Sequence, residues 1–216
     1  MLKPMKNLLI FASGSKDGGG SGFENLVNSA RNGTLQANIV AVVSNHGHGG
    51  VRERADRLGI PFIHFPAPYS AENYQKIVRD TNADFIALSG WLKFVEGLPA
   101  DKTFNIHPAW LPSPFAGKNF YGHHIHEAVL DAYKKGEPVK AGVSMHFVTD
   151  KYDDDAGLFF RKSVEILPDD TVETLAKRVN EVEHKWQPIM TNKVVTGEIS
   201  WDGKNSASLK GVDVEN

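Results

Sequence analysis

The feature that most constrains the fold is the alternation of short apolar runs with amphipathic stretches along the first half of the chain. The apolar runs lie at residues 7–13, 38–44, 61–66, 84–90 and 103–107. The amphipathic stretches between them lie at residues 22–33, 52–59 and 70–81. Runs that are apolar almost throughout predict strands covered on both faces, and the stretches between them predict helices. We therefore expect an α/β fold with a doubly wound, mostly parallel sheet and right-handed crossovers.

The ends of these helices carry suitable capping residues. Gly33 and Gly59 suit helix C-termini because glycine adopts a left-handed conformation without strain. Ser70 suits an N-cap because its hydroxyl can accept a hydrogen bond from the first turn. These residues therefore support the expected helix boundaries.

The second half of the chain has a different pattern. It predicts a helix at residues 123–136, an antiparallel strand pair at 141–150 and 158–166, and a long helix at 171–197. Asp170 is expected to cap the long helix, and Pro188 is expected to kink it. Residues 203–216 are expected to form a loosely held tail. Because the sequence shows no repeat and no linker, we expect a single domain over residues 1–216.

Composition excludes several classes of protein. The chain has no cysteine, which excludes disulfides, thiolate catalysis and cysteine-based zinc sites. Its formal net charge is −2, so neither a nucleic acid nor an acidic membrane is an expected partner. The first apolar run is too short to cross a bilayer and reads better as a buried strand. We therefore expect a cytoplasmic protein that acts on small molecules, as a monomer or homodimer.

The segment NIHP, residues 105–108, presents an amide and an imidazole at the end of an expected strand. Residues i and i+2 of a strand face the same side, so Asn105 and His107 should project together. Pro108 ends the strand and leaves the pair at its carboxyl end, where open α/β sheets bind ligands. An amide and a protonated imidazole could both donate to a developing oxyanion. A polar pair at the edge of the core is the alternative.

Three consecutive acids, residues 153–155, follow in the loop between the two later strands. A carboxylate beside His107 would stabilise the imidazolium and raise the pKa of the ring. A solvated turn is the alternative for at least two of the acids. His123, His124 and His126 would need further ligands to hold a metal, so we favour surface or anchoring roles and expect no metal site.

A glycine-rich stretch, residues 14–23, lies between the first strand and the first helix. Backbone amides at a helix N-terminus bind anions, and this is a usual place for phosphate in a doubly wound sheet. The stretch matches neither the Walker P-loop nor G-x-G-x-x-G, so it carries no nucleotide fingerprint. A flexible loop is the alternative.

Three longer segments resemble the folate-dependent formyltransferases. They read FNIHPAWLPSPFAGKNFYGHHIHEAV, AGVSMHFVTDKYDDDAG and VNEVEHKWQP. The resemblance extends over about residues 6–202 and is most specific at N-I-H-P, the following L-P, and S-x-H-F-V-T-D. It implies the formyltransferase fold. It also implies transfer of a formyl group from the cosubstrate 10-formyltetrahydrofolate to the amine of 5-phosphoribosylglycinamide in purine biosynthesis.

The resemblance also implies a catalytic set. Asn105 and His107 match the pair that acts at the formyl carbon, with an aspartate nearby. Counting forward from H-F-V-T-D selects Asp153, whereas counting back from Gly157 selects Asp155. We favour Asp153 because KYD resembles the tyrosine-aspartate form of the motif, and we keep Asp155 in reserve.

Binding residues follow from the same resemblance. The segment Gly20, Ser21 and Gly22 matches G-S-N, which binds the ribose phosphate in the family, with Gly22 in place of asparagine. Glu183 matches a glutamate that contacts the glycinamide substrate. Four residues match the M-R-I-L segment that lines the folate pocket: Leu92, Lys93, Phe94 and Val95. In that segment a lysine replaces an arginine, which keeps the charge but loses the planar fork.

Other functions stay open at this point. A formyltetrahydrofolate hydrolase, or a formyltransferase that acts on another amine, would carry a similar set of residues. A non-catalytic phosphate-binding module would keep the glycine stretch, but the presence of Asn105, His107 and nearby acids argues against it. A turnover assay with and without the ribonucleotide distinguishes these functions.

Overall fold

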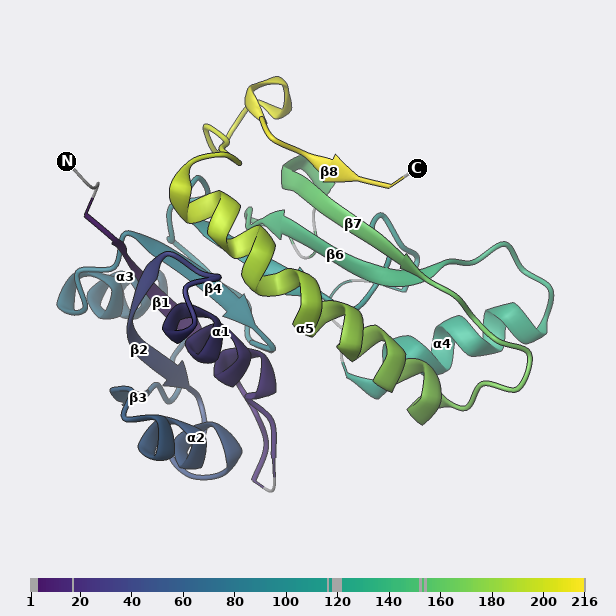
Figure 1. Cartoon of the computed structure of the whole chain (residues 1–216), viewed down its shortest axis with the longest axis horizontal. Helices are drawn as coiled ribbons and strands as arrows, with labels where there is room; N and C mark the ends of the chain where they lie inside the picture. Colours follow the sequence, from purple (N-terminus) through teal and green to yellow (C-terminus); the bar gives the residue numbers. More distant parts are fainter. Residues whose placement is uncertain are drawn as a thin grey trace.

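The computed structural model describes residues 4–16, 18–115, 117, 122–151, 153 and 155–215. Within them one eight-stranded sheet has the order β3-β2-β1-β4-β5-β6-β7-β8 (Figure 1). The parallel strands are β1 (Lys6–Phe11), β2 (Ala37–Ser44), β3 (Phe62–His64), β4 (Phe85–Ser89) and β5 (Thr103–His107). The antiparallel strands are β6 (Ala141–Phe147) and β7 (Leu158–Val164), and β8 (Asp213–Val214) runs parallel to β7. This topology confirms the expected fold class.

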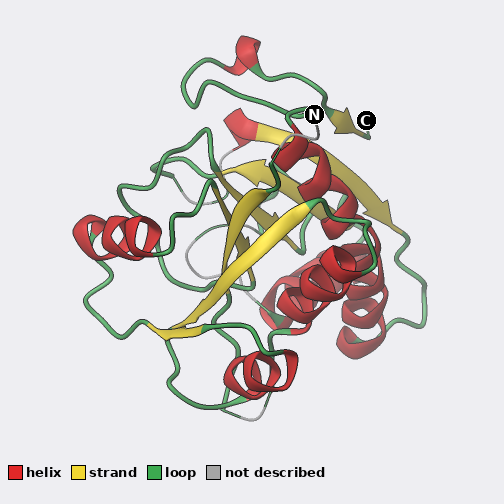
Figure 2. Cartoon of the chain, turned by 60° about the vertical axis from the view of Figure 1, so that its left-hand side comes forward, coloured by secondary structure: helices red, strands yellow, loops and turns green. Residues whose placement is uncertain are grey.

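The α-helices cover the two faces of the sheet unequally. They are α1 (Ser21–Arg31), α2 (Gly50–Leu58), α3 (Ala71–Asp80), α4 (His123–Lys134) and α5 (Val172–Thr196). Two short 3₁₀ helices are η1 (Asp155–Gly157) and η2 (Ser206–Ser208). Figure 2 shows α3 alone on one side of the sheet and the other α-helices across from it. The long helix α5 lies between α1 and α4 (Figure 1).

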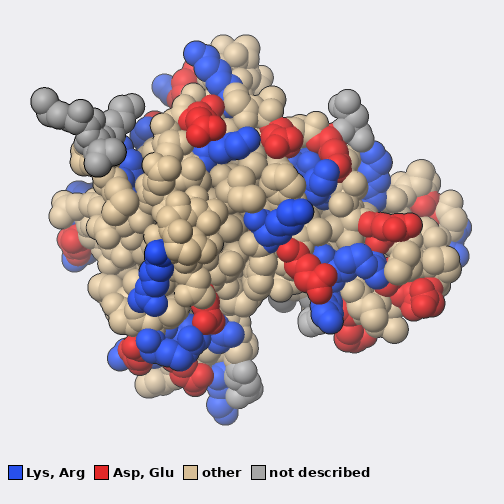
Figure 3. Space-filling model, viewed as in Figure 1, with Lys and Arg blue, Asp and Glu red and all other residues tan. Residues whose placement is uncertain are grey.

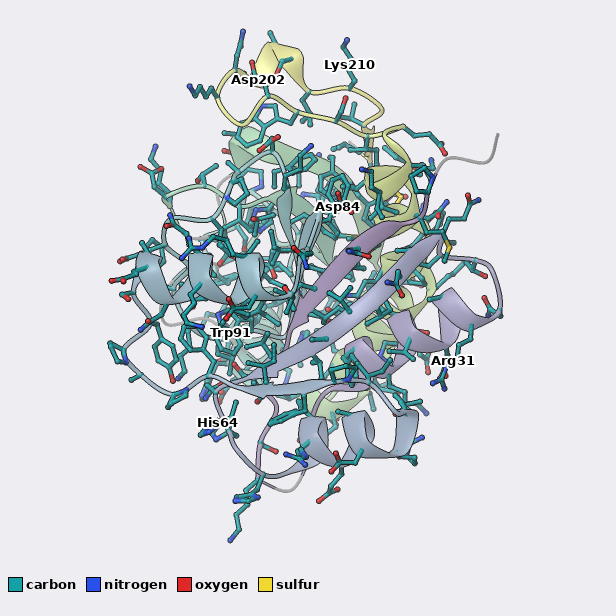
Figure 4. The ribbon with its side chains drawn as sticks, turned by 90° about the vertical axis from the view of Figure 1, so that its left-hand side faces the viewer. Arg31, His64, Asp84, Trp91, Asp202 and Lys210 are labelled. Atoms are coloured by element: carbon teal, nitrogen blue, oxygen red, sulfur yellow. The ribbon has the colours of Figure 1, made fainter. Side chains whose placement is uncertain are left out.

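Alternate residues of the strands build two separate cores. Leu8 and Ile10 pack on the side of α1 and α5, whereas Leu9 and Phe11 pack on the side of α3. All four side chains are fully buried, as expected for strands that are covered on both faces. Trp91 belongs to the core on the α3 side, where Figure 4 shows it beside that helix.

Helix ends follow the sequence with two corrections. The C-cap of α1 is Asn32, and Gly33 follows it in a left-handed conformation. Gly59 is a left-handed C-cap and Ser70 accepts a hydrogen bond from the Asn73 backbone N–H, so both predictions are confirmed. Asp170 is not the N-cap of α5: Thr171 takes that place in a capping box with Thr174. The Asp170 carboxylate instead accepts hydrogen bonds from the Leu167 backbone, the Thr174 hydroxyl and the Arg178 guanidinium.

Two further expectations concern the C-terminal part of the chain. Pro188 lies inside α5, which continues to Thr196, and the kink expected at this residue stays a prediction. The tail expected to be loosely held contains η2 and β8, and β8 extends the sheet beside β7 (Figure 1). The Arg161 guanidinium donates hydrogen bonds to the backbone carbonyls of Glu215 and Leu111. The tail is thereby tied to the loop that follows β5.

Candidate active site

A cavity of about 290 Å³ opens at the carboxyl ends of β4 and β5. The segment from β4 to β5, which passes this point, contains no helix. The cavity is lined by the end of β4, the following loop, the end of β5, the loop between β6 and β7, and α5. This is the position at which open α/β sheets bind ligands. A cavity of this size suits a small molecule.

The predicted amide–imidazole pair lies on this cavity. Asn105 and His107 both line it, and their neighbours Phe104 and Ile106 pack into the core on the opposite side of the strand. The strand ends at His107, directly before Pro108. The two side chains therefore project side by side at the end of the strand, as the sequence predicts.

Asp153 is the acid that lies beside the imidazole. Its Oδ1 is 3.5 Å from His107 Nδ1, and its Oδ2 accepts a hydrogen bond from the Gly117 backbone N–H. It has a positive φ of 45°, an uncommon conformation for a non-glycine residue, and it lines the cavity. Asp155 lies exposed at the start of η1. The geometry favours the first of the two aspartates.

The charge of His107 differs from the sequence expectation. Burial lowers the pKa of His107 to about 4, and this effect outweighs the nearby Asp153 carboxylate, which raises it. His146 and His126 lower the pKa further. Burial therefore favours the neutral ring over the expected imidazolium in the ligand-free protein, because desolvation is the dominant effect.

The second nitrogen of His107 is available to accept a proton. A neutral ring beside a carboxylate carries its proton on Nδ1, which leaves a lone pair on Nε2. That Nε2 is buried and has no hydrogen-bond partner among the described residues. An unpartnered buried nitrogen is costly, so its presence beside a cavity indicates a group that awaits a ligand.

The sequence analysis assigned no role to His146, which also lines the cavity. It lies opposite Asn105 in the pairing of β5 with β6, and its Nε2 is 3.3 Å from Asn105 Nδ2. Its Nε2 is also 3.8 Å from Asp153 Oδ1. The motif S-x-H-F-V-T-D contained this signal, because an antiparallel partner strand places a histidine beside the amide.

The four residues expected to line a folate pocket all line this cavity: Leu92, Lys93, Phe94 and Val95. Their loop is held from two sides. Ser13 Oγ accepts a hydrogen bond from the Leu92 backbone N–H at 2.9 Å, and Tyr74 from α3 donates to the Phe94 carbonyl. Trp91 Nε1 donates to the same tyrosine hydroxyl. These hydrogen bonds fix the shape of the loop without the help of a ligand.

The residues expected at the phosphate, Gly20, Ser21 and Gly22, form the start of α1. They are not part of the lining of the described cavity. Gly20 caps the helix in a left-handed conformation, and the Ser21 hydroxyl is 3.2 Å from His184 Nε2 of α5. Because His184 is next to Glu183, α5 joins the start of α1 to the cavity.

Gly22 is required by close packing. A Cβ at this position would lie 2.3 Å from Ser89 Oγ and 3.0 Å from Gln187 Oε1. Asparagine, which the family has here, would meet the same two groups. Glycine at this position therefore leaves room for the hydrogen bond between the Ser89 and Gln187 side chains, which is 2.9 Å long.

Gly49 and Gly50, to which the sequence analysis assigned no role, pack against the glycine-rich stretch at residues 14–23. A Cβ at Gly49 would lie 2.3 Å from the Ser15 carbonyl, and one at Gly50 would lie 2.4 Å from the Gly18 carbonyl carbon. Backbone packs against backbone here, which only glycine allows. The start of α2 is thereby brought to the glycine-rich loop before α1.

Glu183 projects from α5 into the cavity lining. Burial raises the pKa of its carboxyl to about 7, although the Asn180 amide donates a hydrogen bond that opposes this effect. A carboxyl group that titrates near neutral pH in a cavity is typical of functional sites. Its position therefore suits contact with an amine.

The described residues contain neither a metal-binding cluster nor a membrane-spanning helix. The part of the chain that the structure describes holds no group of three or more His, Cys, Asp or Glu side chains arranged to bind a metal ion. The side chain of His123 lies outside the described residues. No described helix has the length and apolar character needed to cross a membrane. Figure 3 shows acidic and basic side chains intermixed over one face of the molecule.

The fold and cavity define an α/β protein that binds a small molecule at the carboxyl ends of its parallel strands. The family model described as "Formyl transferase" matches residues 6–191. The chain therefore belongs to the formyl transferase family, which confirms the resemblance found in the sequence.

Individual relatives agree with this assignment. A chloroplastic phosphoribosylglycinamide formyltransferase from Arabidopsis thaliana is 32% identical over 91% of this chain and 68% of its own length. Phosphoribosylglycinamide formyltransferase from Bacillus subtilis is 31% identical over 88% of this chain and 95% of its own length. The crystal structure of glycinamide ribonucleotide transformylase 1 from Symbiobacterium toebii matches with a TM-score of 0.79 at 25% identity, covering 97% and 95% of the two chains.

Proposed function

We propose that this chain transfers the formyl group of 10-formyltetrahydrofolate to the amine of 5-phosphoribosylglycinamide, the activity named for its relatives. One observation carries the proposal. The Asn105 amide, the unpartnered His107 Nε2 and the Asp153 carboxylate converge on one cavity. The shared family and the coverage of the bacterial relative support transfer to this amine over the alternatives. A cytoplasmic location and a monomeric or homodimeric state stay predictions.

The proposed reaction begins with attack of the amine on the formyl carbon. A carbon–nitrogen bond forms and negative charge develops on the formyl oxygen, to which the Asn105 amide donates a hydrogen bond. His107 Nε2 accepts the proton that the amine loses, and Asp153 stabilises the resulting imidazolium. The imidazolium then gives the proton to N10 as the bond between N10 and the formyl carbon breaks. No covalent enzyme intermediate is required.

The remaining predicted residues bind the two substrates in this proposal. The loop at residues 92–95 holds the folate, and Glu183 receives the amine of the ribonucleotide. Gly20, Ser21 and Gly22 offer backbone N–H groups at the start of α1 to the phosphate. Binding energy at the phosphate positions the amine, which lies far from it along the ribonucleotide.

The test is a turnover assay with 10-formyltetrahydrofolate, run with and without the ribonucleotide. Formyl transfer that requires the ribonucleotide supports the proposal, whereas release of formate without it supports a hydrolase. Asn105→Ala and His107→Ala should each lower kcat roughly 10²–10³-fold with thermal unfolding close to that of the wild type. Near-normal turnover in either variant would contradict the assigned roles.

A further inference from the structure

We propose that His146 is a positioning residue that fixes the orientation of the Asn105 carboxamide. This inference rests on the proposed function and assigns a role to a residue that the proposed reaction does not use. The observation behind it is the pairing of the two side chains across β5 and β6, with 3.3 Å between His146 Nε2 and Asn105 Nδ2.

The hydrogen-bond partners of His146 determine which ring nitrogen carries the proton. Nδ1 lies 3.0 Å from the backbone carbonyl of Phe147, and a carbonyl can only accept. Nδ1 therefore donates. Asp153 Oδ1 lies 3.8 Å from Nε2, beyond hydrogen-bond distance, so in the neutral ring Nε2 presents a lone pair to Asn105 Nδ2. The group on Asn105 that meets this lone pair must be the donor, its NH₂.

This arrangement decides between two orientations of the amide. A carboxamide can rotate by half a turn, which exchanges its oxygen and its NH₂. In one orientation the NH₂ donates to His146 and has a second N–H left for the formyl oxygen. In the other orientation two acceptors, the amide oxygen and the ring lone pair, face each other, and the catalytic donor is lost. His146 therefore stabilises the orientation that catalysis needs.

The surroundings keep the ring of His146 in place. The side chain is 2% exposed and sits in β6, where every residue is buried. Two residues earlier in the same strand, the Ser144 hydroxyl donates to the Ala109 carbonyl and accepts from the Leu111 backbone N–H. The strand is thus fixed to the loop that follows β5, so the imidazole is held rigidly beside the amide.

The test compares His146→Leu, which removes the acceptor, with His146→Gln, whose side-chain oxygen can replace Nε2. We expect kcat of the leucine variant to fall roughly tenfold, with KM for both substrates changed less than about twofold. The glutamine variant should keep kcat within about threefold of the wild type. In an Asn105→Ala background, His146→Leu should cost less than about twofold, because no amide is left to orient.

A second measurement does not depend on activity. The side-chain NH₂ signals of Asn105, assigned by their loss in Asn105→Ala, should show one slowly exchanging proton in the wild type and in His146→Gln. His146→Leu should lose that protection. An equally low kcat in both His146 variants, or a full tenfold loss in the Asn105→Ala background, would overturn the inference. Absence of ribonucleotide-dependent turnover in the wild type would instead contradict the proposed function, and the NMR result would still decide the role of His146.

Discussion

Glu183 offers a sharp test because its expected effects on stability and activity have opposite signs. Its carboxyl is buried against the cavity, forms no salt bridge among the described residues, and has a pKa that burial raises to about 7. Glu183→Gln removes the charge and keeps the shape and the capacity to accept a hydrogen bond from Asn180. We expect the variant to be more stable and less active than the wild type at pH 8.

The magnitude follows from linkage between ionisation and folding. Below about pH 4.5 the carboxyl is protonated in both the folded and unfolded states, so it does not affect stability. As pH rises towards 7 the unfolded state loses the proton first, and the free energy of unfolding falls. A pKa difference of about 2.5 pH units corresponds to about 3 kcal/mol. Because the residue as a whole is only half-buried and lines an open cavity, solvent screening reduces this to about 1–2 kcal/mol.

Thermal unfolding at pH 5 and pH 8 measures this effect. Glu183→Gln should melt about 3–6 °C above the wild type at pH 8 and only about a quarter of that above it at pH 5, where the folded state still holds the proton and the unfolded state has only begun to lose the benefit of binding it. Its kcat/KM for the ribonucleotide should fall at least about tenfold. Glu181→Gln, on an exposed position of the same helix, is the matched control and should change neither quantity. Equal melting differences at both pH values would refute the reasoning, because the effect would then not arise from ionisation.

Two further predictions concern the acid and the glycine. Asp153→Asn should lower kcat about 10²-fold, because it removes the carboxylate beside His107. Asp155→Asn should keep kcat within about twofold of the wild type. If the two variants rank in the reverse order, Asp155 is the catalytic aspartate. Gly22→Ala should lower the free energy of unfolding by about 1–3 kcal/mol, because the new Cβ would clash with the Ser89 hydroxyl. In most helices the same substitution stabilises the protein. Chemical denaturation measures this loss, and Ser89→Ala should restore part of it only if the clash is the cause.

How far the sequence predicts this structure depends on whether a feature is local. The strand at residues 103–107 is predictable to the residue, because Pro108 ends it for a local reason. The expectation that Asp170 caps a helix is wrong because two neighbouring residues can both accept hydrogen bonds. The hydrogen bond from Arg161 to the Glu215 carbonyl in the C-terminal tail escapes prediction, because no side-chain pattern reveals a contact with a backbone carbonyl.

The features of the site also divide into local ones, which the sequence predicts, and non-local ones, which it does not. The pairing of Asn105 with His107 follows from the period of a strand and is predictable. Spacing alone does not choose between Asp153 and Asp155, because counting from either side of the loop gives different answers; the KYD motif favours Asp153, and the contact of its carboxylate with His107 agrees. The charge of His107 also escapes prediction, since it depends on how deeply the fold buries the ring.

The distribution of polar and apolar residues on the two faces of the sheet explains where the cavity lies. On the α3 side, Phe11 and Leu88 pack under a helix and its neighbouring aromatic residues, so those positions are apolar. Beside Leu88 in the next strand lies Asn105, which lines the cavity. Polar residues on that face, with apolar Phe104 and Ile106 on the other, therefore mark the place where the covering layer ends and a ligand can reach the sheet. The central residues of β1, β2 and β4 are apolar on both faces, whereas β5 alternates polar and apolar residues along its whole length. This one-sided alternation distinguishes a binding edge from a core strand by the order of its residues.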